Sequence, residues 1–386
     1  MQLYGNDFID KLSHSTFDRS HFEGSCEKLS SLSGYALLFV LPKNIQEQRK
    51  YTMTRPPTSD EAAQFARLMQ GHIAMRLLLM AGRIGLIKLL ADGPLHAEEL
   101  AEFTGLSSQV MPRILRAMSS IGVLEVKADG RYVGTGMLGM IDMLLAPGFD
   151  ESSYIAWGHA DHTLRTGEPA WDQVFGKPFY DSLDLNQLEA FNVWNTRATV
   201  ASPPIAAMSF WSKYREIVDV GGGQGALIAD ILAANPGMKG RLLDRPESLR
   251  DAPVILQQRK VSDRCVIQPG NFFQEVPKGG DAYILSRVLL NWNDEKCLAI
   301  LESIANATEE GATLVVIDLI IPPYDHPAYC FAVMNDLNLL VNFGGATRSE
   351  SELRKLIEMA PFRVTHVEIF KPPSLIGIII AQRKSL

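Results

Sequence analysis

An apolar strand that runs into a glycine-rich turn and then into a helix constrains this chain more than any other feature. The stretch is Ile217–Gly225, in which Gly221, Gly223 and Gly225 follow Asp219 at short spacing. Glycine permits a positive φ and lets a ligand lie against bare backbone. A strand, such a turn and a helix in this order are typical of a ligand-binding loop in a parallel α/β sheet.

Two aspartates near the turn narrow the class of ligand. Dinucleotide sites prefer the spacing Gly-x-Gly-x-x-Gly with a pyrophosphate at the helix N-terminus, and the spacing here is different. Asp219 lies two residues before the first glycine, where a carboxylate repels a phosphate and favours a cation such as an ammonium group. Asp244 ends the next predicted strand, where a carboxylate accepts hydrogen bonds from ribose hydroxyls. The agreement of loop, acids and strands favours a cationic nucleoside ligand over a purely structural turn.

Strands and helices alternate over the second half of the chain, which predicts an α/β fold with a parallel sheet covered on both faces. The predicted strands are Glu216–Val220, Arg241–Leu243, Val266–Gln268, Ala282–Leu285 and Thr313–Ile317, and the predicted helices are Ala226–Ala234, Asp294–Ala307 and Glu350–Met359. Two final strands, Arg363–Ile369 and Leu375–Gln382, are close enough to pair as an antiparallel hairpin.

The first half of the chain predicts a winged helix. Helical periodicity begins at Ser59 and continues to the breaker Gly93-Pro94. The segments that follow are a helix at Ala97–Phe103, a turn at Gly105-Leu106, an N-cap at Ser107-Ser108, a helix at Val110–Ile121, and strands at Val123–Val126 and Arg131–Val133 around Ala128-Asp129-Gly130. Residues 96–135 carry four basic and five acidic side chains, a balance unfavourable for reading a DNA groove. We therefore expect packing or dimerisation here, and not DNA binding.

The composition and charge of the chain limit which classes of protein remain. The 386 residues are 46% hydrophobic and 21% charged, as in an ordinary globular protein of two domains or three small ones, and the net charge of −7 argues against a nucleic-acid partner. No apolar run reaches the roughly 18–20 residues that span a bilayer, and no signal peptide is evident, so we expect a cytoplasmic protein without a membrane partner. The four cysteines form no C-x-x-C pair, which predicts free thiols.

Several motifs together resemble the class I S-adenosylmethionine-dependent small-molecule O-methyltransferases of the plant caffeate and bacterial natural-product type. The motifs are Val218–Gly225, Leu243-Asp244-Arg245-Pro246, Gly270-Asn271-Phe272-Phe273, Leu285–Lys296, and Asp336-Leu337 with Gly344–Arg348. The resemblance covers about residues 60–384. It implies a Rossmann-like seven-stranded methyltransferase domain and an N-terminal all-helical winged-helix domain that forms a homodimer.

The domain organisation that follows has three parts. Residues 1–52 are an N-terminal arm, either packed on a partner subunit or disordered. Residues 53–200 are the helical dimerisation and substrate-lid domain, and residues 201–386 are the catalytic domain that binds S-adenosyl-L-methionine.

The resemblance also assigns cofactor residues by position. It implies that Gly221 and Gly223 contact the methionine part of S-adenosylmethionine, that Asp244 binds the ribose, and that Asn271 and Phe272 flank the adenine. Asn271 stands where the family usually has aspartate, and an amide still accepts a hydrogen bond from the adenine amine. The remaining residues expected around the cofactor are Asp219, Gly225, Arg245, Ser286, Arg287 and Arg197, the last for the cofactor's carboxylate or else in a surface ion pair.

The general base of the family is missing. The familiar Leu-His-Asp-Trp motif is here Leu289-Leu290-Asn291-Trp292, as in the anthracycline branch, and Leu290 cannot accept a proton. Asp318 retains the carboxylate expected at the end of a strand. We therefore predict methyl transfer by proximity and orientation, with Leu290 as an apolar wall and Asn291 as a hydrogen-bond donor. The alternatives are a non-methylating S-adenosylmethionine-bound hydroxylase, decarboxylase or pericyclase, and a catalytically silent binding protein.

A flat aromatic or polyketide-like substrate is expected from the side chains near the predicted pocket. His162 is the candidate replacement base, with a surface histidine as the alternative. The residues expected to contact substrate are His159, Trp157, Trp194, Asn338 and Asn342, with Phe175 and Phe343 in the same aromatic set; core packing and polar helix caps are the alternatives. His159 and His162 have no third ligand nearby in the sequence, so no metal is predicted.

Overall fold

The computed structural model describes residues 55–141, 144, 146–200, 204–371 and 374–385, with the backbone alone for 196–200. The predicted arm at 1–52 lies outside these residues. Contacts divide the chain into two units, Met1–Met69 and Gln70–Leu386. Within the first unit the structure describes residues 55–69, which contain helix α2 (Ser59–Met69). The domain boundaries expected after residues 52 and 200 stay predictions.

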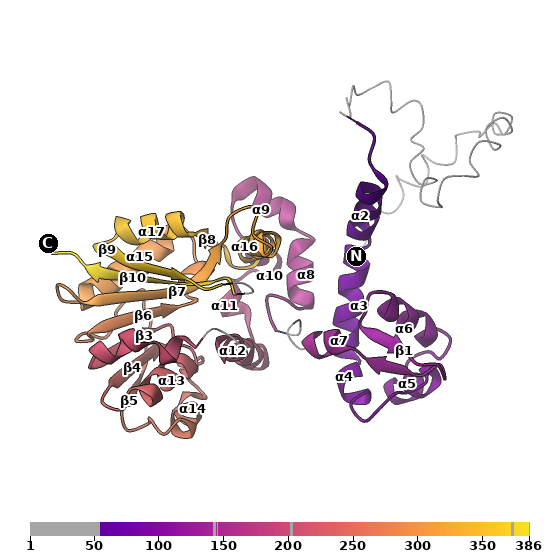
Figure 1. The fold of residues 1–386 in the computed structure, drawn as a ribbon, viewed down its shortest axis with the longest axis horizontal. Helices are drawn as coiled ribbons and strands as arrows, with labels where there is room; N and C mark the ends of the chain where they lie inside the picture. The colour runs from indigo at the N-terminus through magenta and orange to yellow at the C-terminus, as the bar shows by residue number, and fades with distance from the viewer. Residues whose placement is uncertain (1–54, 142–143, 145, 201–203, 372–373, 386) are drawn as a thin grey trace. The chain divides into compact units, whose positions relative to one another are not determined.

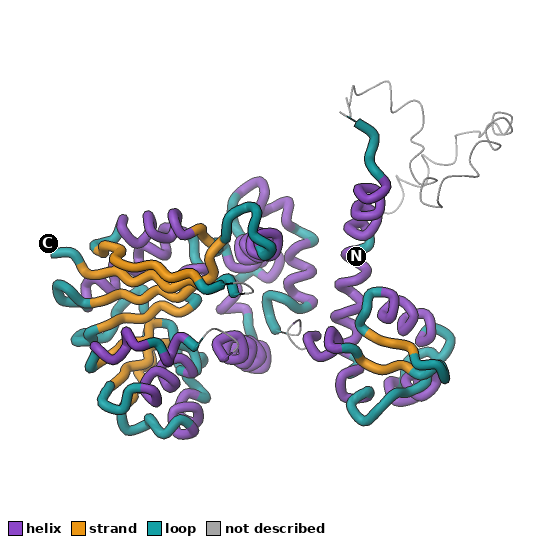
Figure 2. Tube along the Cα trace, in the orientation of Figure 1, coloured by secondary structure: helices purple, strands orange, loops and turns teal. Residues whose placement is uncertain are grey.

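The second unit begins with a small helical part (Figures 1 and 2). Its elements are α3 (Gly71–Arg83), α4 (Leu86–Leu89), α5 (Ala97–Thr104), α6 (Met111–Ser120), β1 (Leu124–Val126), β2 (Tyr132–Gly134) and α7 (Gly136–Met140). Strands β1 and β2 pair antiparallel, and Gly130 forms the turn between them with φ 83°. Two helices followed by a hairpin confirm the predicted winged-helix arrangement.

Two details of this part differ from the prediction. The helix expected from Ser59 to Gly93 is interrupted, because Gly85 adopts the left-handed conformation with φ 73° and separates α3 from α4. The N-cap of α6 is Val110, without a side-chain cap, and Ser107 instead accepts backbone hydrogen bonds in the preceding turn.

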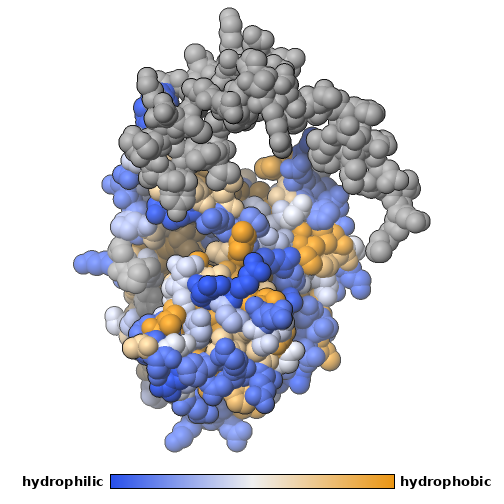
Figure 3. Space-filling model, turned by 90° about the vertical axis from the view of Figure 1, so that its right-hand side faces the viewer, coloured by the Kyte–Doolittle hydropathy of each residue, from blue (hydrophilic) through white to orange (hydrophobic). Residues whose placement is uncertain are grey.

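A compact core holds the winged helix together, and apolar side chains also reach its surface. Leu86, Leu100, Leu115 and Met118 are fully buried in one cluster. Figure 3 shows hydrophobic surface lying between hydrophilic areas on one face of the molecule. The exposed large hydrophobic residues of this part are Ile73, Phe103, Leu106, Val110, Val126, Met137 and Met140.

A helical connection leads to the sheet. Its elements are α8 (Glu151–Trp157), α9 (Ala160–Thr166), α10 (Ala170–Phe175), α11 (Phe179–Ser182), α12 (Leu185–Val200), η5 (Ile205–Ala207) and η6 (Ser209–Lys213). The sheet part then contains β3 (Glu216–Val220), α13 (Ala226–Ala234), β4 (Lys239–Asp244), α14 (Ala252–Gln258), β5 (Cys265–Pro269), β6 (Ala282–Ser286), η7 (Leu289–Asn291), α15 (Asp294–Ala307), β7 (Thr313–Ile321), α16 (Tyr329–Phe343), β8 (Arg348–Ser349), α17 (Glu350–Met359), β9 (Phe362–Ile369) and β10 (Ile376–Arg383).

The sheet has seven strands in the order β5-β4-β3-β6-β7-β10-β9, and the two-residue β8 pairs with β7 at its side. Strands β3 to β7 are parallel, and β10 runs antiparallel to both β7 and β9. This confirms the predicted Rossmann-like fold with its C-terminal hairpin. The prediction omitted α14 and β8, and it ended β7 four residues early.

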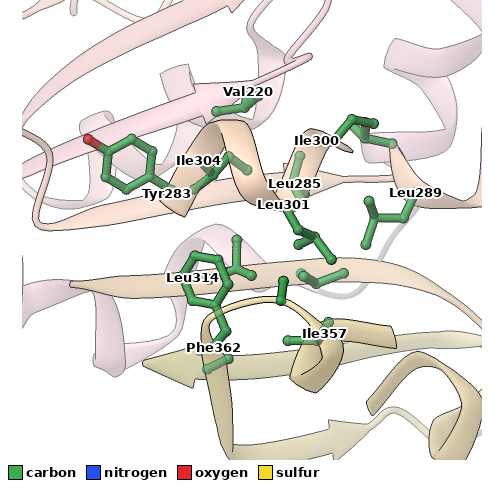
Figure 4. Packing of buried hydrophobic residues seen from close by; sticks show 14 of the residues in the cluster. Val220, Tyr283, Leu285, Leu289, Ile300, Leu301, Ile304, Leu314, Ile357 and Phe362 are labelled. Atoms are coloured by element: carbon green, nitrogen blue, oxygen red, sulfur yellow. The ribbon is translucent and has the colours of Figure 1, made fainter. Parts of the chain in front are cut away.

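Both faces of the sheet are buried, which explains why its strands are almost continuously apolar. Figure 4 shows one face, where Tyr283, Leu285 and Leu314 of the sheet pack against Ile300 and other residues of α15 and α17. On the opposite face Ile217, Ile284 and Val315 pack against α13 and α14. The parallel strands are thereby fixed, and their carboxyl ends lie together at one edge.

Two further sequence predictions can be compared with the structure. Cys265, Cys297 and Cys330 are free thiols, and Cys26 lies outside the described residues. No helix in the described part of the chain is both long and apolar enough to span a bilayer.

Candidate active site

A cavity of about 630 Å³ lies at the carboxyl ends of β3, β4, β5 and β6. Ligands of open α/β sheets bind at this edge. Residues from α10, α11, α12 and α16 form the remaining walls. The predicted cofactor and catalytic residues that line the cavity are Asp219, Gly221, Gly223, Asp244, Arg245, Asn271, Phe272, Ser286, Arg287 and Asn291.

At Gly221 and Gly222 of the glycine turn, a side chain would collide with neighbouring atoms. Gly221 has φ 73°, and a Cβ there would lie 2.9 Å from the Cγ2 of Val288. A Cβ on Gly222 would lie 2.5 Å from the carboxyl group of Asp219. Gly223 has open space where its side chain would be. The turn therefore leaves bare backbone facing the cavity. Gly225, the N-cap residue of α13, does not line it.

Asp244 connects the end of β4 to this turn. Its Oδ2 accepts a hydrogen bond from the Gly223 amide at 2.7 Å, and its Oδ1 accepts one from the Arg245 amide at 2.7 Å. Burial raises the pKa of Asp244, and the two amide donors partly oppose that rise. Each carboxylate oxygen can accept a second hydrogen bond, so Asp244 can still accept from hydroxyl donors.

Asp219 is the most unusual charge in the cavity wall. Its side chain is 1% exposed, and neither carboxylate oxygen has a hydrogen-bond partner among the described residues. Burial, with the nearby charge of Asp244, raises the pKa of Asp219 to about 7. A buried carboxylate without donors is costly, and a cationic ligand group supplies the missing partner. The residues present therefore fit a ligand that carries an ammonium group.

Helix α11 contacts the end of β4 through Arg245. The Nη1 of Arg245 lies 3.2 Å from Oδ1 of Asp181, and its Nη2 donates to the carbonyl of Tyr180 at 3.4 Å. The guanidinium also lies 5.5 Å from the centre of the Tyr180 ring. Tyr180, Asp181 and Arg245 all line the cavity. This contact closes one side of the site, and no sequence motif indicated it.

Aromatic side chains form much of the cavity wall. Tyr180 lies 5.8 Å from Trp292 and Phe273 lies 5.0 Å from Trp292, measured between ring centres. Phe179 packs against Phe343 at 4.1 Å. Flat, apolar surfaces of this kind suit a purine or an aromatic ring.

The position of the missing base contains no proton acceptor. Leu290 is 8% exposed, and its side chain does not line the cavity. Its amide donates to Oδ2 of Asp318 at 3.2 Å, while Oδ1 of Asp318 accepts from the Leu319 amide. Burial raises the pKa of Asp318 to about 7. Asp318 therefore supports the η7 turn from behind, and Asn291 of that turn reaches the cavity wall.

Comparison with known proteins identifies the family. A family model described as an O-methyltransferase domain matches residues 157–363, more than half of the chain. The chain belongs to the O-methyltransferase family. A second model, described as an O-methyltransferase dimerisation domain, matches residues 66–137 of this O-methyltransferase.

Three curated relatives of this O-methyltransferase come from Streptomyces species. O-demethylpuromycin-O-methyltransferase of Streptomyces alboniger is 33% identical over 82% of this chain and 89% of its own length. Mitomycin biosynthesis 6-O-methyltransferase of Streptomyces lavendulae is 35% identical over 77% of this chain and 88% of its own length. Aclacinomycin 10-hydroxylase of Streptomyces purpurascens is 30% identical over 77% of this chain and 83% of its own length.

Solved structures show the same fold. The mitomycin 7-O-methyltransferase superimposes with a TM-score of 0.76 at 32% identity, over 83% of this chain and 97% of that one. An O-methyltransferase from neocarzinostatin biosynthesis, in complex with S-adenosylmethionine and 2-hydroxy-5-methyl naphthoic acid, gives 0.71 at 25% identity, over 80% and 95%. The protein is therefore an S-adenosylmethionine-dependent methyltransferase.

Asn338 and Asn342 lie away from the cavity of this O-methyltransferase, although the sequence suggested that they face substrate. Oδ1 of Asn338 accepts from the Trp157 indole at 2.9 Å, and Nδ2 of Asn342 donates to the Ser153 hydroxyl at 3.0 Å. The two amides connect α16 to α8. Their helical spacing placed them on one face, and α8 covers that face.

The other predicted substrate and base residues also lie outside the lining. His159 is exposed, and His162 is half-buried on α9. Trp194 packs on Phe149 with ring centres 4.9 Å apart, and Phe175 packs on Trp171 at 4.4 Å. Trp157 is also absent from the lining, so Phe343 is the member of the predicted aromatic set that reaches the cavity. The side chain of Arg197 lies outside the described residues.

Sequence reasoning missed several lining residues. Asn192 and Asn195 come from α12, Asp172 from α10 and Lys296 from α15. Arg348, which belongs to the quoted Gly344–Arg348 motif, is buried and donates to the carbonyls of η7 and its neighbours. The α12 residues belong to no motif, and only their helical spacing could have indicated a shared face.

Proposed function

We propose that the protein transfers a methyl group from S-adenosylmethionine to a hydroxyl of an aromatic or polyketide-like natural product. The Asp219 carboxylate beneath the glycine turn is the observation that carries this proposal. It has no hydrogen-bond partner among the residues that the structure describes, so it calls for a cationic ligand at that point. The aromatic walls of the cavity favour flat ligands such as aromatic rings. S-adenosylmethionine, when bound, supplies an electrophilic methyl group on a sulfonium.

The residues that would hold the methionine and ribose parts lie around the glycine turn. Asp219 would pair with the ammonium group, and the bare backbone of Gly221 and Gly223 would lie along the methionine chain. Asp244 would accept from the ribose hydroxyls. These roles are supported by exposed backbone and by the remaining acceptor capacity of the Asp244 carboxylate.

The adenine would lie among residues that follow β4, β5 and β6. Asn271 and Phe272 would flank it, Arg245 would close that side through α11, and Ser286 and Arg287 would line the opposite wall. Arg197 stays a predicted partner for the cofactor's carboxylate.

Proton loss from the acceptor hydroxyl would proceed without a histidine at position 290. Orientation of two reactants within a closed site supplies a large part of many barriers. The aromatic walls would hold the acceptor ring, and Asn291 would donate a hydrogen bond to it. An acceptor that is already acidic, such as a phenol beside a carbonyl group, suits this site.

We also propose that the protein forms a homodimer through residues 66–137. The match to a dimerisation domain and the exposed hydrophobic side chains of α3, α5 and α7 support this. Light scattering coupled to gel filtration tests it: a monomer across micromolar concentrations contradicts the proposal. The cytoplasmic location and the absence of nucleic-acid and membrane partners stay predictions.

The decisive experiment measures binding first and chemistry second. Calorimetry with S-adenosylhomocysteine is expected to give a heat of binding for the wild type and none for Asp244→Ala. Leu290→His should retain binding, and its turnover should change far less than that of Asp244→Ala. Incubation with methyl-labelled cofactor and a panel of phenolic polyketides is expected to give labelled product. Product of unchanged mass with unconsumed cofactor, or product that gains oxygen, would contradict methyl transfer. Loss of activity in His162→Ala with harmless Leu290→Ala and Asp244→Ala would overturn the site assignment.

A further inference from the structure

Arg348 places a buried positive charge at the wall of the cavity. The residue is 6% exposed and is one of those that line the cavity. Its backbone belongs to β8, which pairs with Ile320 of β7, so the sheet fixes its position. A guanidinium in a ligand cavity commonly binds an anion. Whether Arg348 can do so depends on how many of its N–H groups the protein itself engages.

The protein engages every N–H group of this guanidinium. Nε and Nη2 donate to Oδ1 of Asp294 at 2.9 and 2.7 Å. Nη1 donates to the carbonyls of Leu289 and Ala346 at 3.2 and 3.1 Å, and Nη2 also donates to the Trp292 carbonyl at 2.9 Å. These bonds use all the donors that a guanidinium has. Arg348 therefore has none left for a ligand, and it acts on the site through the residues that it holds.

The segment held by Arg348 is the η7 turn. The carbonyls of Leu289 and Trp292 lie at the two ends of that turn, and the Leu290 carbonyl between them accepts from the Ala346 amide at 2.9 Å. A Cβ on Gly345 would collide with this same Leu290 carbonyl, so the two segments are in close contact. Residues 344–348 thus bind η7 through three of its carbonyls and fix its backbone.

The η7 turn contributes two side chains to the cavity wall. Asn291 and Trp292 both line the cavity, and the Trp292 ring lies 5.8 Å from the Tyr180 ring between centres. The side chains of Asn291 and Trp292 can keep their directions only while the backbone of the turn is held. In a site without a histidine base, the rate depends chiefly on how well the acceptor is oriented.

We propose that Arg348 is a positioning residue for methyl transfer. It fixes η7 so that Asn291 and Trp292 hold the acceptor hydroxyl in line with the methyl group. This inference rests on the proposed function. It predicts that weakening the hold of Arg348 lowers kcat, while the sites that bind the ligands stay intact.

Arg348→Lys tests the role directly, because lysine keeps the charge but has three donors and no planar fork. We expect kcat to fall by about 10- to 100-fold, since a displacement of about 1 Å can cost a factor of that order. The Kd of S-adenosylhomocysteine should stay close to the wild-type value. The KM should also stay close to that value, measured with the phenolic polyketide that the wild type methylates fastest. The pH–rate profile should keep its shape, because Arg348 moves no proton.

Asp294→Ala is a second variant that does not endanger the fold. The Asp294 side chain is 72% exposed, and its removal takes away the acceptor of two of the guanidinium donors. We expect kcat to fall by about three- to tenfold, the range that one or two hydrogen bonds supply. If Arg348→Lys does not fold, this variant decides the question.

Arg264→Lys is the matched control. The Arg264 guanidinium also donates to backbone carbonyls, those of Leu232, Asn235 and Met238, but these residues lie before β4 begins and do not line the cavity. The same substitution should lower the urea midpoint there and leave kcat unchanged. An equal loss of kcat in Arg264→Lys would show that general loosening of the fold lowers the rate, which would overturn the role of Arg348.

The remaining outcomes separate this inference from the proposed function. Full kcat in folded Arg348→Lys and in Asp294→Ala would overturn the positioning role alone. Weaker S-adenosylhomocysteine binding or a raised acceptor KM at unchanged kcat would also overturn it, because Arg348 would then contact a ligand. A wild-type protein that methylates no member of the panel would overturn the proposed function and this inference together.

Discussion

Replacing Asp219 with asparagine should make the ligand-free protein more stable at neutral pH while weakening its hold on the cofactor. The carboxylate is buried without a hydrogen-bond donor among the described residues, and burial raises its pKa from 3.8 to about 7. Asparagine has nearly the same shape and carries no charge, so it removes the ionisation and leaves the packing against Gly222 intact.

The size and sign follow from proton linkage. In the unfolded chain Asp219 ionises near pH 3.8, whereas in the folded protein it keeps its proton until about pH 7. The folded state therefore loses stability as pH rises from about 4 to about 7, and the loss then levels off. A rise of the pKa from 3.8 to about 7 corresponds to about 4 kcal/mol, at roughly 1.36 kcal/mol for each unit of pKa.

Urea unfolding of both ligand-free proteins between pH 5 and pH 8 measures this effect. The stability advantage of Asp219→Asn should grow by about 1.4 kcal/mol per pH unit and saturate near pH 7 at about 4 kcal/mol. Calorimetry at pH 8 should show weaker S-adenosylhomocysteine binding. Asp263→Asn removes a charge from an exposed position as the control. A stability difference that stays constant across this pH range would refute the argument.

Two other changes test the walls of the cavity. Gly222→Ala should cost about 1–3 kcal/mol of stability in urea unfolding and reduce cofactor affinity, because its Cβ would lie 2.5 Å from the Asp219 carboxyl group. Gly237→Ala is the control, because a Cβ there would have open space around it. Equal effects of the two substitutions would contradict this prediction. Asp181→Asn should raise the S-adenosylhomocysteine dissociation rate in stopped-flow fluorescence by no more than about fivefold, since its pair with Arg245 is largely exposed and such pairs contribute about 0.2–1 kcal/mol. An unchanged rate would show that the contact does not hold α11 over the site.

The glycine turn and its two acids could be located from the sequence because their geometry is local. A buried strand, the glycines and the helix that follows are consecutive, and Asp244 ends the neighbouring strand. Parallel pairing of β3 with β4 then brings Asp244 to the turn without further assumptions. The alternation of apolar strands and helices likewise specified the sheet.

The helical walls could not be predicted in the same way. Spacing shows that Asn338 and Asn342 share a face of α16, but it does not show that α8 packs on that face. Asn192 and Asn195 likewise lie one turn apart on α12, but they line the cavity. The difference depends on which helix packs against which, and tertiary contacts decide that. The break at Gly85 was missed because apolar periodicity continues through it.

The apolar, buried side chain at position 290 cannot accept a proton, so deprotonation depends on the acidity of the acceptor hydroxyl itself. The rate for a series of ring-substituted phenols should then follow the acidity of the reacting hydroxyl, with electron-withdrawing groups accelerating transfer. The pH–rate profile should move with each acceptor and show no fixed inflection from an imidazole near 6.5. Such an enzyme selects among hydroxyls in similar positions by their acidity. Earlier oxidations that place a carbonyl group beside one hydroxyl raise its acidity, and they would therefore decide which position is methylated.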